Sequence, residues 1–145
     1  MGAIRRDVVW YVRMLEEAMI RGTAELGVAA ERVAGKTGIW VQSENREQKL
    51  AAIGVHISRW VTSHGFAYNV ATDLRYFEMI VPCGIADCKT TSLEKLLGRS
   101  VQSEEIAPRI VKHFGEAFGL ELKETSPMEL LDRLQQVERP MAASA

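Results

Sequence analysis

Hydrophobic residues near the start of the chain recur at the spacing of one helical face. They are separated by four, three and four positions, and they are Val8, Val12, Leu15 and Met19. Asp7 stands directly before this stripe, where an N-cap side chain accepts a backbone hydrogen bond. Gly27 is a candidate for the left-handed residue that ends a helix. The pattern therefore predicts a helix of about 20 residues between Asp7 and Gly27.

The middle of the chain carries the patterns typical of antiparallel strands. Thr37–Gln42 reads as a strand, the polar stretch Ser43–Gln48 as a hairpin connection, and Lys49–Ser58 as the return strand. Trp60–Val70 is a further strand region that we expect to break near Gly65. The remaining expected strands are short and lie at 28–33 and 120–123.

The stretch 71–90 has no clean period, and we expect an ordered loop of the kind that often carries function. Thr91 and Glu94 make a capping box for a short helix that ends at Gly98. Strands followed by helices, without alternating βαβ units, predict an α+β fold. Its sheet should be mixed but largely antiparallel, with the helices packed on one side.

Two more helices are predicted in the last third of the chain. Ser103 caps the first, and Gly119 stops it. Pro108 is late for a first-turn proline, so this helix is expected to start closer to it. Ser126 followed by Pro127 signals the start of the second. The apolar stripe of the first consists of Ile106, Ile110, Phe114 and Phe118.

The composition is that of a globular domain. The 145 residues are 47% hydrophobic and 26% charged, with a net charge of -1, which fits one domain. This balance argues against sequence-independent binding of nucleic acid, which needs a basic excess. The sequence carries no signal-peptide pattern and no apolar run of membrane-spanning length. We therefore expect no membrane partner and a reducing, cytoplasmic setting.

Cys83 and Lys49 are the candidate catalytic residues. Cys83 lies between stiff Pro82 and permissive Gly84, as a candidate nucleophile. A cation held close to a thiol favours the reactive thiolate, and Lys49 could supply it. The same amine, once neutral, could take a proton from an attacking amine. Together the two residues predict acyl transfer through a thioester.

Each of these residues also has a simpler interpretation. An isolated cysteine is more often a buried small hydrophobe, and an isolated lysine on a strand usually faces solvent. His64 fits a hydrogen-bonded structural role better than that of a base. Cys83 and Cys88 would form a thiol sensor only if their sulfurs reach disulfide distance. Packing is the expected role of the three tryptophans, Trp10, Trp40 and Trp60.

A series of motifs at ordered spacing runs between Arg5 and Leu134. They are Thr37-Gly38-Ile39-Trp40-Val41, Lys49-Leu50-Ala51-Ala52-Ile53-Gly54, His64-Gly65-Phe66-Ala67-Tyr68-Asn69-Val70, Ile80-Val81-Pro82-Cys83-Gly84, Thr91-Ser92-Leu93 and Leu97-Gly98. In this order they resemble the lipoyl(octanoyl) transferases of the biotin/lipoate ligase superfamily. Several motifs at family-like spacing are far more specific than any one of them.

The resemblance implies an enzyme of lipoate biosynthesis. Its donor would be octanoyl-acyl carrier protein, and its acceptor a lysine in the lipoyl domains of 2-oxoacid dehydrogenase and glycine cleavage complexes. By resemblance, Cys83 carries the acyl thioester and Lys49 adjusts that cysteine. No metal, nucleotide or other cofactor is implied, because the donor thioester is already activated. The implied acyl-site residues are Ala52, Ile53, Gly54, Gly65, Phe66 and Ala67, with His64 shaping the site.

The chain departs from this family at its N-terminus. Family members carry an Arg-Gly-Gly run and a Tyr-His-Gly-Pro-Gly-Gln motif before the helix that starts here near Asp7, and this sequence has neither. We therefore expect a truncated biotin/lipoate ligase-like fold. Residues 1–134 would be the C-terminal portion of an octanoyltransferase-like catalytic domain, and 135–145 a frayed tail.

The absent portion would supply strands and one wall of the acyl pocket, so strand edges would be exposed without it. A complementing chain or a homo-oligomer would then have to cover them. The alternative function is an inactive or split fragment that acts only as a binding module.

Overall fold

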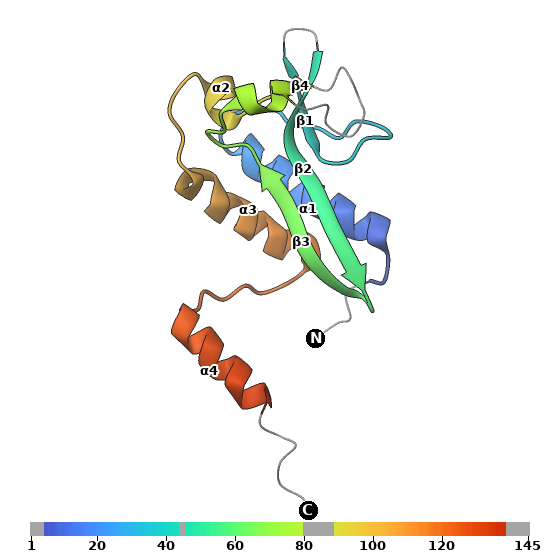
Figure 1. The fold of residues 1–145 in the computed structure, drawn as a ribbon, viewed down its shortest axis with the longest axis vertical. Helices are drawn as coiled ribbons and strands as arrows, with labels where there is room; N and C mark the ends of the chain where they lie inside the picture. The colour runs from blue at the N-terminus through green and yellow to red at the C-terminus, as the bar shows by residue number, and fades with distance from the viewer. Residues whose placement is uncertain (1–4, 44–45, 80–88, 139–145) are drawn as a thin grey trace, which may run out of the picture.

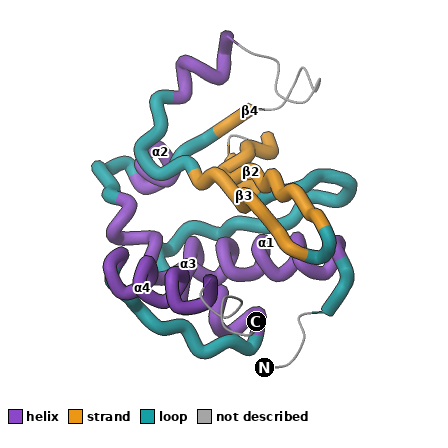
Figure 2. The backbone as a smooth tube through the Cα atoms, turned by 60° about the horizontal axis from the view of Figure 1, so that its bottom comes forward, coloured by secondary structure: helices purple, strands orange, loops and turns teal. Residues whose placement is uncertain are grey.

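The computed structural model of the chain describes residues 5–43, 46–79 and 89–138. Helices α1 and α3 lie against one face of the sheet, and α4 lies beyond them (Figure 1; Figure 2). This arrangement confirms the predicted α+β class with helices on one side. The elements in order are α1 (Val8–Ala24), β1 (Ile39–Ser43), β2 (Arg46–Ser58), β3 (Val61–Tyr68), the 3-10 helix η1 (Leu74–Met79), β4 (Lys89–Thr90), α2 (Leu93–Leu97), α3 (Ser103–Phe118) and α4 (Pro127–Glu138).

The sheet is largely antiparallel, as predicted. Strand β2 lies between β1 and β3 and runs antiparallel to both. The short strand β4 adds a parallel pairing, with Lys89 opposite Gln48 and Thr90 opposite Lys49. Strand β1 reaches along β2 only as far as Ala51, which pairs with Ile39. Beyond Ala51 the sheet is therefore a two-stranded ribbon of β2 and β3 (Figure 1).

The turn between β2 and β3 contains two residues in the left-handed region. Ser58 pairs with Val61, so Arg59 and Trp60 form the whole turn. Their φ angles are 50° and 64°. Two-residue turns of this shape favour Asn-Gly, because most side chains are strained at positive φ. The hairpin tip therefore holds an exposed tryptophan in a strained backbone.

The predicted break of β3 near Gly65 is wrong. Gly65 pairs with Gly54 in a register that runs unbroken from Ser58 to Ala51. The departure from regular strand geometry falls one residue earlier, at His64, whose φ is 66°. Glycine has a low propensity for strands, but the backbone hydrogen bonds between β2 and β3 keep Gly65 within the strand.

The polar stretch predicted as a hairpin connection is mostly strand. Strand β1 continues to Ser43 and β2 already begins at Arg46, with Gln42 opposite Glu47. Gln48 is only 2% exposed, and its side-chain amide donates to the backbone carbonyl of Ser43. Polar side chains enter the sheet here because their backbone groups complete the ladder with β1.

The core lies where α1 and α3 meet the paired part of β1 and β2. From the predicted α1 stripe, Leu15 and Met19 are buried, whereas Val8 is 44% exposed. At the other end of the helix pair, the Phe118 ring lies 5.5 Å from that of Trp10 and 5.6 Å from that of Tyr11. Burial of each large side chain stabilises the fold by about 1.5–3 kcal/mol. The buried cluster consists of Met19, Val28, Ile39, Val41, Leu50, Ala51, Leu93, Val101, Ile106 and Ile110.

The helix ends follow the predicted capping chemistry with small shifts. The Asp7 carboxylate accepts from the Trp10 N–H, as predicted. Ser92, not Thr91, caps α2, because its hydroxyl accepts from the Lys95 N–H. The cap of α3 is Gln102 in place of the predicted Ser103. Left-handed glycines end α2 and α3 at Gly98 and Gly119, as predicted, whereas α1 ends at Ala24, before Gly27.

Three further expectations about local structure are wrong. Helix α3 begins five residues before Pro108, which lies on its exposed side, where water can hydrate the carbonyl that the ring leaves free. The stretch 120–123 forms no strand, and 28–33 contributes only the isolated bridge between Glu31 and Trp40. Short apolar runs form strands only where a neighbouring edge is available for pairing.

Helix α4 has the start predicted at Pro127, and the Ser126 hydroxyl accepts from the Glu129 N–H. It continues to Glu138, so the predicted domain boundary at 134 falls inside a helix. Four of its side chains are exposed and apolar, namely Met128, Leu130, Leu131 and Leu134. Among the described residues, none of the helices has the length and apolar character needed to cross a membrane.

Candidate functional site

Lys49 lies at a point of β2 that pairs with both β1 and β4, as does its neighbour Gln48. It pairs with Trp40 of β1 on one side and with Thr90 of β4. Its backbone carbonyl also accepts from the Thr91 N–H at 2.9 Å. The side chain is half-buried, and its Nζ lies 4.7 Å from the centroid of the Trp40 ring. The backbone of this lysine is thus fixed by pairing, and its ammonium rests on an aromatic ring.

Trp40 is a residue of this site that the sequence interpretation assigned to packing alone. It is 1% exposed, and its ring also carries the ammonium of Lys36 at 4.8 Å. Lys36 in turn pairs with the carboxylate of Glu47 at 2.6 Å. No sequence signal could have found this contact, because it depends on the register that places Trp40 opposite Lys49 in the antiparallel pair.

Two buried polar atoms near Lys49 have no hydrogen-bond partner among the residues that the structure describes. They are the indole Nε1 of Trp40 and the hydroxyl of Thr91. Such atoms are uncommon inside proteins and each costs about 1–3 kcal/mol. Both atoms lie beside the junction of β1, β2 and β4.

The predicted nucleophile Cys83 lies outside the described residues, as does Cys88. The distance between the Cys83 sulfur and the Lys49 ammonium therefore stays a prediction, and so does the thiol sensor. The described residues stop at Met79 of η1 and resume at Lys89, which pairs with Gln48. Thr90, which pairs with the predicted lysine, is thus seven positions after the predicted cysteine in the sequence.

The predicted acyl-site residues come from two strands that the fold brings together. Ala52 pairs with Ala67, Ile53 with Phe66, and Gly54 with Gly65, while His64 lies opposite Val55. Tyr68 on the same face as Phe66 reaches helix α1, where its hydroxyl bonds to Thr23 at 2.8 Å. Because side chains alternate along a strand, the alanine and glycine pairs face away from the helices.

This outer face of small residues is open. Ala52, Gly54 and Ala67 are exposed, and a Cβ added at Gly54 or Gly65 would meet no atom within 4 Å. It begins three residues along β2 from Lys49. An extended acyl chain laid over these pairs would meet no bulky side chain from them.

The ribbon of β2 and β3 also has unpaired edges. The Leu50 carbonyl accepts from Asn69, so Leu50 directs its backbone toward β3. Alternation then directs the backbone groups of Ile53, Val55 and Ile57 to the other edge. Within residues 5–43, 46–79 and 89–138, no backbone hydrogen bond connects that edge to another segment. Sheet edges of this kind are normally paired or covered.

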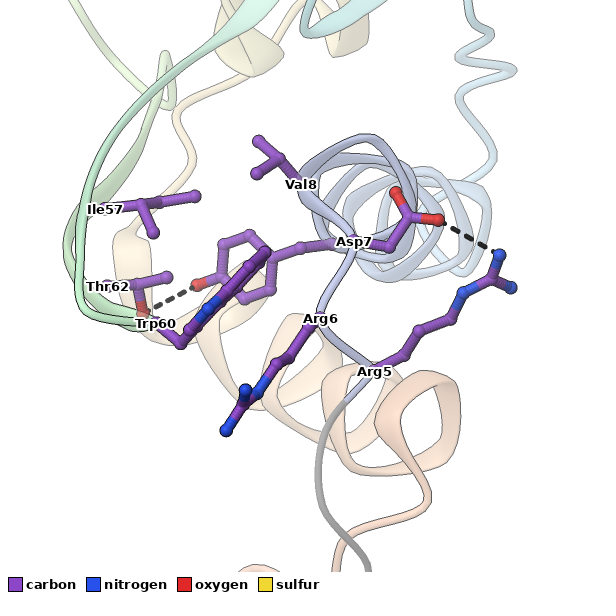
Figure 3. A pocket seen from close by; sticks show the side chains of 8 residues that line it. Arg5, Arg6, Asp7, Val8, Ile57, Trp60 and Thr62 are labelled. Atoms are coloured by element: carbon purple, nitrogen blue, oxygen red, sulfur yellow. Dashed lines mark hydrogen bonds and ion pairs between the residues drawn. The ribbon is translucent and has the colours of Figure 1, made fainter.

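A cavity of about 100 Å³ lies at the far end of the hairpin, between the strained turn and the start of α1 (Figure 3). The Arg6 guanidinium lies beside the Trp60 ring, 5.8 Å from its centroid, whereas Arg5 turns away to pair with Asp7 at 3.0 Å. The strand from Lys49 to the hairpin turn is about 30 Å long. This cavity is therefore separate from the site around Lys49.

The described ranges contain no group of three or more His, Cys, Asp or Glu side chains arranged to hold a metal ion.

Tyr68, which links β3 to helix α1, gives the fold an alkaline sensitivity. Burial raises its pKa to about 12, although the hydrogen bond with Thr23 acts in the opposite direction. The ordinary value is near 10, so the neutral phenol stabilises the fold below pH 10. This contribution should be lost as the pH rises from 10 through 12, by at most about 1.4 kcal/mol per pH unit.

The measurement is denaturant unfolding at a series of alkaline pH values, with tyrosinate absorbance as the readout of ionisation. A Tyr68→Phe variant should be less stable at neutral pH but should lose less of its remaining stability between pH 10 and 12. An unchanged alkaline slope in that variant would contradict the assignment.

Solved structures define the class of fold. A bi-partite lipoate protein ligase from Thermoplasma acidophilum superposes with a TM-score of 0.64 and 16% identity, over 94% of this chain and 56% of that protein. The biotin protein ligase of Aquifex aeolicus superposes with a TM-score of 0.58 and 16% identity, over 88% of this chain and 52% of that protein. The fold is therefore that of the biotin and lipoate ligases, which confirms the predicted fold.

The sequence narrows the class to one family. The chain belongs to the lipoyl protein ligase A/B catalytic domain family, whose model matches residues 2–115. An octanoyltransferase of Koribacter versatilis is 54% identical over 111 residues, which are 77% of this chain and 44% of that protein. One from Acidobacterium capsulatum is 50% identical over 135 residues, which are 90% of this chain and 55% of that protein. The chain spans about half the length of the curated relatives it matches.

Proposed function

We propose that this chain carries the acyl-transfer half of an octanoyltransferase. In this proposal an octanoyl group passes from acyl carrier protein to a lysine of a lipoyl domain in the cytoplasm, as a step of lipoate assembly. The single observation that carries the proposal is the 54% identity to the Koribacter versatilis octanoyltransferase. Residues 1–134 would correspond to the C-terminal portion of the catalytic domain of such an enzyme.

The chemistry assigned to the site is two successive acyl transfers. The Cys83 thiolate attacks the carbonyl carbon of the octanoyl thioester, the bond from that carbon to the donor sulfur breaks, and the donor leaves as a thiol with a proton from the Lys49 ammonium. The acceptor lysine then attacks the Cys83 thioester, an amide bond forms, and the Cys83 sulfur leaves. Lys49 favours the thiolate in the first step and, as a neutral amine, takes the proton of the attacking amine in the second. No further co-reactant is required, because the donor thioester supplies the driving force.

The open face of small residues is the proposed bed of the octanoyl chain. Two of its members, Ala52 and Gly54, lie on β2, three and five residues along the strand from Lys49. The pairs they form with Ala67 and Gly65 leave the face unobstructed. An acyl chain needs to be covered from water as well as seated, because each buried methylene contributes about 0.8 kcal/mol. A second wall over this face is therefore needed to keep water away from the acyl chain.

We propose that the second wall is the half of the relatives that this chain does not match. The unpaired edge of Ile53, Val55 and Ile57 lies directly beside the open face, and an added strand there would extend the sheet. The structural neighbour from Thermoplasma acidophilum is described as bi-partite, so two-part construction has a precedent in this fold.

The test is an acylation assay with two polypeptides. The purified chain is incubated with octanoyl-acyl carrier protein, with and without the unmatched portion of the Koribacter versatilis octanoyltransferase. Mass spectrometry should find one octanoyl group on Cys83, which transfers to an added lipoyl domain. The Cys83→Ser variant should abolish labelling, and Lys49→Met should lower its rate about 100-fold or more. Cys88→Ser is the matched control and should label normally.

The outcomes separate the two functions. Labelling that survives Cys83→Ser would contradict the thioester mechanism. A stable complex of the two polypeptides without any acylation would favour the alternative, a fragment that acts only as a binding module. The free edge of β2 is the observation that keeps this alternative in view.

A further inference from the structure

We infer that Trp40 is a positioning residue for Lys49: its indole ring holds the lysine ammonium in place for the acyl-transfer reaction. The inference rests on the proposed function, because it assigns a partner to the lysine of that reaction. It gives a role in the reaction to a residue that the sequence analysis expected only to pack.

The backbone places the two side chains together. Trp40 and Lys49 are directly opposite in the antiparallel pair of β1 and β2. The register shifts between Ile39 and Trp40, so the pairing is irregular at this point. Such bulges re-aim side chains in a sheet. The result is an ammonium 4.7 Å from the ring centroid, well within the range of a cation–π interaction.

The ring itself is held rigidly. Trp40 is 1% exposed, and its backbone N–H donates to the Glu31 carbonyl while its own carbonyl accepts from the Glu31 N–H. Within residues 5–43, 46–79 and 89–138 its buried indole Nε1 has no hydrogen-bond partner, so hydrogen bonds from the side chain to these residues do not account for where the ring lies.

Lys36 provides an internal comparison on the same ring. Its ammonium lies 4.8 Å from the centroid, but it also pairs with the Glu47 carboxylate at 2.6 Å. Within the part of the chain that the structure describes, no carboxylate pairs with Lys49. The two lysines therefore share the ring but differ in how their N–H groups are used.

This difference suits the proposed chemistry of Lys49. A carboxylate would accept the ammonium N–H groups as hydrogen bonds and would hold its proton. A ring attracts the charge through its face and leaves the three N–H donors free for other acceptors. Lys49 can then donate to a thiolate or to an acyl oxygen while its position stays fixed. Trp40 thus orients the lysine without competing for the proton it must exchange.

The test changes the charge distribution of the ring and keeps its shape. Trp10→Phe and Trp60→Phe leave Trp40 as the single tryptophan, which is then replaced by mono-, di- and trifluorinated tryptophan during expression. Fluorine withdraws electron density from the ring face and weakens cation binding in steps. The rate of Cys83 octanoylation should fall in the same order, by about tenfold across the series. The melting temperature should change little.

Lys36→Met is the matched control. It removes the other ammonium from the same ring, and the octanoylation rate should stay within about twofold of the unsubstituted protein. Trp40→Phe should keep most of the rate, because a smaller ring still presents a face to the ammonium. Trp40→Leu should lose more of the rate than Trp40→Phe when both are compared as folded protein.

A second measurement does not depend on activity. In proton–carbon NMR spectra the ε-methylene signals of Lys49 and Lys36 should be displaced by the ring current of Trp40, and each should vanish in its own Met variant. A Lys49 signal at the ordinary position, or a rate that ignores fluorination, overturns the inference. Displaced signals in a protein that never octanoylates would overturn the proposed function and support the placement of Lys49 on the ring.

Discussion

Replacing Glu16 by glutamine should lower the free energy of unfolding by about 3–5 kcal/mol. Glu16 lies on α1 with its side chain 0% exposed. One carboxylate oxygen accepts from the Gly38 N–H at 3.1 Å, and the other accepts from Arg13 at 2.7 Å and Arg32 at 3.1 Å. The amide nitrogen of a glutamine must replace one of these oxygens, so a donor would face a donor. Urea unfolding followed by circular dichroism measures the loss.

Glu17→Gln is the matched control for this prediction. Glu17 is the next residue on α1 and pairs with Arg32 as well, at 2.6 Å, but its side chain is 26% exposed. The pKa of Glu17 is held below its ordinary value chiefly by the hydrogen bond from Arg32. Water replaces most of what is lost at such a site, so the cost should be at most about 1 kcal/mol. Equal losses in the two variants would contradict the role given to burial of Glu16.

Gly38→Ala should cost about 3 kcal/mol or more, the second large effect. Gly38 has a φ of 101°, a region that L side chains rarely adopt. A Cβ at this position would also run into the backbone carbonyl of Ala51, which cannot move because it belongs to the central strand. Backbone strain and steric overlap therefore add. The same urea titration gives the measurement.

Gly35→Ala separates the two contributions. Gly35 also has a positive φ, 75°, but a Cβ there would meet nothing within 4 Å. Only the backbone strain remains, and we expect a cost of about 1 kcal/mol. A loss at Gly38 no larger than the loss at Gly35 would rule out the close approach to Ala51.

Both large effects occur at the junction that starts β1. Glu16 fixes the N–H of Gly38, and Gly38 lies against Ala51 at the last pairing between β1 and β2. Trp40 and Lys49 form the next pairing along this ladder. A buried carboxylate on α1 therefore sets where the ring and the ammonium lie, which links the stability of the core to the geometry of the proposed site.

Much of the fold could be predicted because its signals are local. The spacing of Leu15 and Met19 gives α1, and that of Ile106 and Ile110 gives α3, since a buried helical face repeats within a few residues. Asp7, Gly98 and Gly119 act as predicted because caps and left-handed stops depend only on neighbouring backbone groups.

Other parts could not be predicted because they depend on partners distant in the sequence. Gly65 stays within β3 because Gly54 pairs with it, and Arg46 begins β2 because Ser43 lies opposite. The partnership of Trp40 with Lys49 required the register of two strands and the irregular pairing between them. The motifs point to Lys49 and Cys83 as chemistry, yet they give no indication that a tryptophan serves the lysine.

The amino-acid sequence determined the α+β class, the helix stops at Gly98 and Gly119, and the membership of the lipoyl protein ligase A/B catalytic domain family. It also determined the candidate pair Cys83 and Lys49, because periodicity, capping and motif order are written along the chain. Tertiary structure decided that Lys49 lies where β1, β2 and β4 meet, with its ammonium on the ring of Trp40. It also decided that the small residues of β2 and β3 form one open face beside an edge that no described segment pairs with. These features arise only when segments far apart in sequence pair in a definite register, and no local pattern encodes that register.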